Sequence, residues 1–148
     1  MTHTAYEIEL VPSETEGDYF EAMMATITGL SKGEIRERVP AQLLDAKRWR
    51  GASFREVAHA LGYNVLPRFV KFDPATAWPC VLRIKVPEQW GWKGCWWALL
   101  YNQREVYDVQ RNQSYSLEQW QRIWPECRIT SMLPIWISTE TTLSAFQR

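Results

Sequence analysis

Few side chains in this sequence could act as a nucleophile or as its base. The chain has three cysteines and two histidines: Cys80, Cys95, Cys127, His3 and His59. A catalytic cysteine reacts as the thiolate and needs a neighbouring base, usually a histidine that a third polar group orients. One combination meets this need by residue type, with Cys95 as nucleophile, His59 as base and Asp108 as the orienting acid. It would give cysteine hydrolase chemistry.

Each member of this set also has a structural explanation. The neighbours of Cys95 are apolar and would raise the pKa of its thiol, which favours a packed residue over a nucleophile. His59 falls near the edge of the apolar face of a predicted helix, and Asp108 ends a predicted strand, where Asp is common in turns. The cysteines and histidines lack zinc-ligand spacing, and no Gly-rich phosphate loop is present, so we expect no metal and no cofactor.

Tryptophan and basic residues supply the candidate binding surfaces. Among nine tryptophans, Trp90 and Trp92 alternate with Gly in a segment of loop composition. Exposed tryptophans of this kind anchor partner proteins, and the alternative is that these two rings fold back onto the core. A second candidate mixes basic and aromatic residues, which suits single-stranded nucleic acid, although a basic loop after a helix is the commoner explanation: Lys47, Arg48, Trp49 and Arg50.

Composition limits the class of protein. The 148 residues are 46% hydrophobic and 23% charged, which is enough to build the core of one globular domain, so we expect a single domain over 1–148 with a surface tail at 138–148. The 17 basic and 17 acidic residues give a net charge of zero, which argues against a nucleic-acid partner. No apolar run approaches membrane-helix length and the start lacks the features of a signal peptide. We therefore expect no membrane partner and a cytoplasmic location.

The elements that must position these residues fall into two halves. The first half predicts a short strand at 5–11 and then helices. Asp18 and Gly29 would bound the first helix, Ser31 would begin the second, and Ser53 and Gly62 would bound the third. The second half predicts strands at 64–66, 69–72, 81–86, 95–101 and 104–108, a helix after Ser116, and a strand at 128–137. Helices followed by an antiparallel sheet make an α+β domain.

Three predictions about the strands are specific. The apolar run 95–101 is typical of a central strand buried on both faces. Trp96 and Trp97 would point to opposite faces of that strand, one into the core and the other under the helices. Pro134 interrupts the last strand, which suits an edge or a bulge.

The order and hydrophobicity of three stretches resemble a known family. The stretches are 18–31, 51–63 and the strand segments 79–82, 94–101 and 106–108. Together they look like the papain-like cysteine peptidases, above all the bacteriocin-processing branch and small phage-borne proteins that share its layout. The resemblance implies N-terminal helices packed on a C-terminal antiparallel sheet. It also implies a nucleophilic Cys at the start of the first helix, a His at the start of a central strand and an Asp or Asn on the next strand.

The chemistry departs from that pattern. The nucleophile position falls at about Tyr19, the histidine position falls at about Cys95 or Trp96, and only Asp108 matches. The resemblance therefore implies a peptidase-like scaffold without peptidase chemistry. We expect a non-catalytic protein, of the kind encoded by phages or mobile elements, that binds a host protein through Trp90, Trp92 and the basic segment 47–50. The alternatives are a divergent cysteine hydrolase that uses Cys95 and a small nucleic-acid-binding module.

Overall fold

Helices precede strands along the chain, and the fold is mixed α+β. The computed structural model describes residues 7–44, 51–92, 94 and 96–136. Its helices are α1 (Tyr19–Thr28), α2 (Lys32–Arg38), α3 (Gly51–Ala60) and α4 (Leu117–Ile123), with short 3₁₀ turns η1 (Glu16–Asp18), η2 (Ala41–Leu43) and η3 (Glu88–Trp90). Its strands are β1 (Asn64–Val65), β2 (Val70–Lys71), β3 (Cys80–Lys85), β4 (Trp96–Tyr101), β5 (Glu105–Asp108), β6 (Gln113–Ser116) and β7 (Arg128–Trp136).

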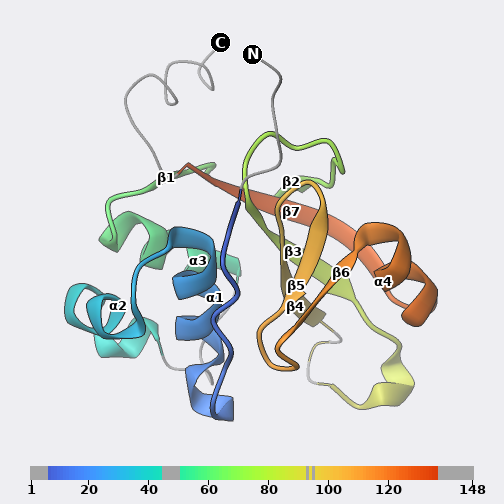
Figure 1. Cartoon of the computed structure of the whole chain (residues 1–148), viewed down its shortest axis with the longest axis horizontal. Coiled ribbons are helices and arrows are strands. Elements are labelled where there is room, and N and C mark those ends of the chain that lie inside the picture. The colour runs from blue at the N-terminus through green and yellow to red at the C-terminus, as the bar shows by residue number, and fades with distance from the viewer. Residues whose placement is uncertain (1–6, 45–50, 93, 95, 137–148) are drawn as a thin grey trace.

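The strands form one open antiparallel sheet in the order β1-β7-β3-β4-β5-β6. The last strand in sequence, β7, lies inside the sheet: it pairs with β3 on one side and with β1 and β2 on the other. Figure 1 shows α1, α2 and α3 on one side of the sheet and α4 on the other. Within the described residues, the longest helices have ten residues, and no helix is long and apolar enough to cross a bilayer.

Two apolar cores lie on the two faces of the sheet. Val81, Leu100 and Leu133 belong to the core on the side of α1, α2 and α3, together with Met24 and Ile27 of α1. The alternate strand residues, among them Leu82, Ile84 and Leu99, belong to the core with Trp120 of α4. Since successive side chains of a strand point to opposite faces, β3 and β4 contribute to both cores. The prediction that 95–101 forms a strand buried on both faces is confirmed from Trp97 onward.

Most of the predicted helix ends are confirmed. Gly29 ends α1 in the left-handed conformation at φ 78°, and its N–H donates to the Ala25 carbonyl. Ser31 accepts a hydrogen bond from the Glu34 N–H and begins α2. Ser116 Oγ accepts from the Gln119 N–H at the start of α4, and the Ser116 N–H donates to Gln119 Oε1. These signals involve residues three or four apart, so local sequence is enough to specify them.

Two predicted helix starts are wrong in detail. Ser53 lies inside α3, which begins at Gly51, so it is no N-cap. Asp18 stands at the N-cap position of α1, but its side chain makes no capping bond to that helix. Its carboxylate instead accepts hydrogen bonds from the preceding Glu14 and Thr15 N–H groups.

The strand predictions also need correction. Residues 7–11 form no strand, because the segment lies beside α1 and makes isolated bonds, such as Val11 N–H to Thr26 Oγ1. Pro134 occupies neither an edge strand nor a bulge. The Ile135 N–H donates to the Pro79 carbonyl, so the Pro134 nitrogen faces the other side, at the gap between the β1 and β2 pairings. The irregularity in the β3–β7 register falls at Thr130. The predicted tail at 138–148 lies outside the described residues.

Candidate functional site

Five tryptophans form an aromatic cluster on the α4 side of the sheet. Trp97 is at its centre, with ring centroids 6.3 Å from Trp90, 5.7 Å from Trp92, 5.8 Å from Trp120 and 5.4 Å from Trp124. Several of the pairs meet edge to face, the arrangement that aromatic quadrupoles favour. Within the described residues, the buried indole N–H groups of Trp97 and Trp120 have no hydrogen-bond partner.

Each member of the cluster is positioned by its element. Trp97 enters the cluster because it alternates with Trp96 along β4, and Trp120 and Trp124 lie four residues apart at the end of α4. Trp90 ends η3, and Gly91 at φ 72° reverses the chain so that Trp92 meets Trp90 edge to face at 5.2 Å. Trp90 and Trp92 are half-buried: their inner sides pack on the core and the rest of each ring faces solvent.

Asp108 and Arg111 close the edge of the cluster. The Arg111 guanidinium lies 5.4 Å from the ring centroids of both Trp97 and Trp124, and it donates to Asp108 Oδ2 at 2.7 Å. The other carboxylate oxygen accepts the Gln110 and Arg111 N–H groups. The fully buried Asp108 therefore holds the turn between β5 and β6. This is the turn role considered for it, and both of its carboxylate oxygens accept hydrogen bonds.

Tyr19, from the opposite face of the sheet, contacts β4 at Ala98, the residue next to Trp97. β4 pairs with β5 only at Leu100 and Tyr101, and the free Ala98 carbonyl accepts the Tyr19 hydroxyl. Burial, and then the negative charge of Asp108, raise the pKa of Tyr19, so its hydroxyl stays protonated. The positive charge of Arg111, and after it the Trp97 indole, partly offset this rise in the pKa of Tyr19. Tyr19, Trp97 and Asp108 thus share one electrostatic environment.

The remaining catalytic candidates are not assembled in the described part of the chain. Cys95 lies outside the described residues. His59 is exposed in the last turn of α3, and no hydrogen bond or ion pair among the described residues joins it to Asp108. Burial raises the pKa of the Cys80 thiol far above its usual range. Burial, with the nearby Glu126 charge, raises the pKa of Cys127 to about 11. Both thiols are therefore poor nucleophiles.

The binding candidates separate in the same way. The basic segment Lys47, Arg48, Trp49 and Arg50 lies outside the described residues, whereas Trp90 and Trp92 lie together at the surface. Arg111 is a member of the site that sequence reasoning missed. Its only sequence signal is its place three residues after Asp108 in a turn, and its contacts with Trp97 and Trp124 depend on the fold.

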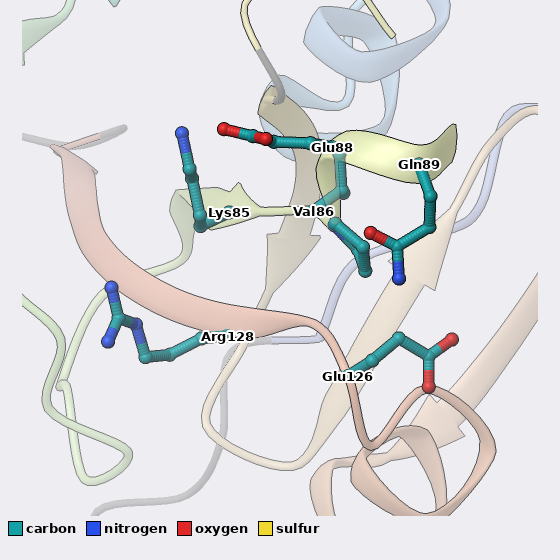
Figure 2. Close-up of a pocket in the computed structure, with 7 residues that line it drawn as sticks. Lys85, Val86, Glu88, Gln89, Glu126 and Arg128 are labelled. Carbon is teal, nitrogen blue, oxygen red and sulfur yellow. The ribbon is translucent and has the colours of Figure 1, made fainter. Parts of the chain in front are cut away.

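A shallow hollow of about 530 Å³ lies beside η3. Figure 2 shows Gln89 and Glu126 pointing toward one another across it, with Lys85 and Arg128 at the opposite end. Its lining holds two acidic and two basic side chains, so it has the character of a polar surface. Among the described residues, no group of three or more His, Cys, Asp or Glu side chains could hold a metal ion.

Comparison with known proteins leaves the family of the chain open. No protein-family model matches the sequence, and no curated protein is significantly similar to it.

Proposed function

We propose that this chain is a non-catalytic binding protein, built on a papain-like scaffold, that acts by binding a host protein. The observation that carries the proposal is the state of the groups at the predicted catalytic positions. Tyr19 stands at the predicted nucleophile position, and its protonated hydroxyl is committed to the Ala98 carbonyl. The carboxylate of Asp108, the predicted orienting acid, is committed to Arg111 and to a backbone turn. Such a set stabilises a scaffold and offers no attacking group.

The binding surface in this proposal is the Trp90–Trp92 surface, defined as Glu88, Gln89, Trp90 and Trp92. Its two rings rest against Trp97, so their orientation is fixed before a partner arrives. Rigid aromatic rings lose little conformational entropy on binding and bury a large area, which is why such residues dominate interfaces. The resemblance to small phage-borne proteins supports a host protein as the partner.

The test is quantitative partner capture with the purified chain as bait. We expect one host protein to be enriched by the wild-type chain and lost with the Trp90→Ala plus Trp92→Ala variant. Both rings pack on the core, so removing them can disturb the fold as well as the surface. A second variant, Gln89→Arg, avoids this because it changes only an exposed side chain of the same surface. It should also weaken capture. Arg104→Ala, in the turn at the opposite end of β4, is the matched control and should bind as the wild type does.

Two results would overturn the proposal. One is wild-type capture by both surface variants with circular dichroism spectra that match the wild type, since the surface would then be unused. The other is hydrolysis of a peptide or ester substrate by the wild-type chain that is lost in Cys95→Ser, since the chain would then be an enzyme.

A further inference from the structure

The register of the sheet gathers four cations around Trp96 on the face that also carries α1, α2 and α3. Lys85 stands directly opposite Arg128 on β7 and directly opposite Trp96 on β4. Arg83 stands opposite Ser131, which in turn stands opposite Lys71 of β2. Directly opposite residues share a face of an antiparallel sheet, so these side chains lie together, within strand spacings of about 5 Å and along-strand spacings of about 7 Å.

This group, which we call the Trp96 face (Lys71, Arg83, Lys85, Trp96 and Arg128), is accessible. Trp96 is 37% exposed, and Lys71, Arg83 and Arg128 are exposed. The apolar residues that meet the helices on this side of β3 and β4, such as Val81 and Leu100, stand farther along the same strands. The helices therefore do not cover the Trp96 end of this face.

The cations of the Trp96 face have two acidic neighbours, because Glu88 and Glu126 line the same hollow as Lys85 and Arg128. Within the described residues, none of the four cations of this face forms an ion pair, although Lys32, Arg36, Arg111 and Arg122 all do. Like charges directly opposite across two strands, as in the Lys85–Arg128 pair, destabilise a sheet unless an anion joins them. The Arg83 guanidinium and the Lys85 ammonium lie 4.3 Å and 4.8 Å from the Trp96 ring centroid, so the aromatic group and the cations form one unit.

From this arrangement we infer that the Trp96 face binds single-stranded nucleic acid. Lys and Arg side chains would contact phosphates, and a base would stack on the part-exposed indole or on the Arg83 guanidinium that lies over it. An acidic protein would also satisfy the cations, but the pairing of a flat guanidinium with an indole is the platform on which nucleic-acid bases stack. Trp96 and Trp97 point to opposite faces of β4, and the Trp96 face meets the Trp90–Trp92 surface at the hollow that Lys85, Arg128, Glu88 and Gln89 line. The net charge of zero conceals the Trp96 face, because residues 1–31 carry six acidic residues and no Lys or Arg.

The experiment is fluorescence anisotropy with a labelled oligothymidylate of about 16 nucleotides, titrated at several salt concentrations. Four phosphate contacts predict a slope of about −2.8 for the logarithm of affinity against the logarithm of salt concentration. The double variant Lys85→Ala plus Arg128→Ala should bind more weakly and flatten the slope to about −1.4. Trp96→Ala should weaken binding by about tenfold or more with little change in slope, and should lose the quenching of tryptophan fluorescence by the oligonucleotide.

Arg104→Ala removes an exposed cation far from the Trp96 face, and Ile123→Ala removes an exposed apolar side chain from α4. Both are controls and should bind as the wild type does. Poly-glutamate is the control ligand, because it carries negative charge but has no bases to stack on Trp96. The inference is wrong if the chain fails to bind the oligonucleotide even at about 10 mM salt, where screening is weakest. It is also wrong if poly-glutamate binds as tightly as the oligonucleotide and Trp96→Ala has no effect, since the partner would then be an acidic protein.

Discussion

At the scale of single residues, Asp18 shows how one carboxylate can fix an element from outside it. Its oxygens accept hydrogen bonds from the Glu14 and Thr15 N–H groups and from the Ser13 hydroxyl. Lys32 Nζ forms an ion pair with Asp18 Oδ2 at 2.7 Å. Burial alone would raise the pKa of Asp18, but Lys32 and the N–H donors outweigh it and hold the pKa well below its usual range. Asp18 thus ties the segment before α1 to α2.

The pH dependence of stability follows from this shift. A carboxyl with a depressed folded-state pKa stabilises the fold above its unfolded pKa, here 3.8, and that contribution is lost as the pH falls through the lower folded-state value. We expect Asp18→Asn to lower the free energy of unfolding by about 2 kcal/mol at neutral pH, with the difference from wild type narrowing below about pH 4. Urea unfolding at pH 7 and pH 3 measures both. Glu9→Gln, at an exposed position, is the control, and a pH-independent difference for Asp18→Asn would contradict the assignment.

The three thiols give the second prediction at this scale. A pKa of about 11 for Cys127, against an ordinary 9.0, leaves about a hundredfold less thiolate at neutral pH, and the Cys80 thiol is fully buried. We expect both to react with iodoacetamide far more slowly than free cysteine, as read by mass spectrometry from acid to mildly alkaline pH. The proposed function extends the expectation to Cys95. Rapid labelling of Cys95 below neutral pH would mark an activated thiolate and count against a non-catalytic protein.

At the scale of elements, predictability follows the range of the interactions. The Gly29 end of α1 and the Ser116 start of α4 are specified within four residues, and both were predicted. The strand β6 was not. Its residues Gln113–Ser116 are polar, and they form a strand because β5 offers them a partner, with Val106 opposite Tyr115. An edge strand of this kind has no hydrophobic alternation to reveal it.

In the candidate sites too, the features set by neighbouring residues were predicted and those set by distant segments were not. Alternation along β4 predicted that Trp96 and Trp97 face opposite ways, and that is confirmed. It also predicted that both rings would be covered, one in the core and one under the helices; Trp97 is buried, but Trp96 is 37% exposed beside Arg83 and Lys85. Those cations come from another strand, and Arg128 and Lys71 come from two more. Only the pairing of β2, β3, β4 and β7 brings them together, and alternation along one strand does not reveal which strands are its neighbours.

At the scale of the molecule, the sheet joins the two cores. β3 sends Val81 to the helix side and Leu82 and Ile84 to the tryptophan side, so neither core can lose its packing without disturbing the strand they share. The antiparallel ladders of β3 with β4 and β7 run the length of the strand. This arrangement predicts that residues 1–148 unfold as one cooperative unit, as small single domains usually do.

Two matched substitutions test this cooperativity. Ile27→Val removes one methyl group from the core beside α1, and Ile84→Val removes one from the core beside the aromatic cluster; both side chains are fully buried. Each should lower the free energy of unfolding by about 0.5–1.5 kcal/mol. Far-UV circular dichroism follows the helices, and tryptophan fluorescence is dominated by the cluster around Trp97. If the two cores form one unit, each variant shifts both urea transitions to the same midpoint, although each change is remote from one of the probes. If Ile27→Val moved only the circular dichroism transition and Ile84→Val only the fluorescence transition, the helices and the sheet would be separate folding units.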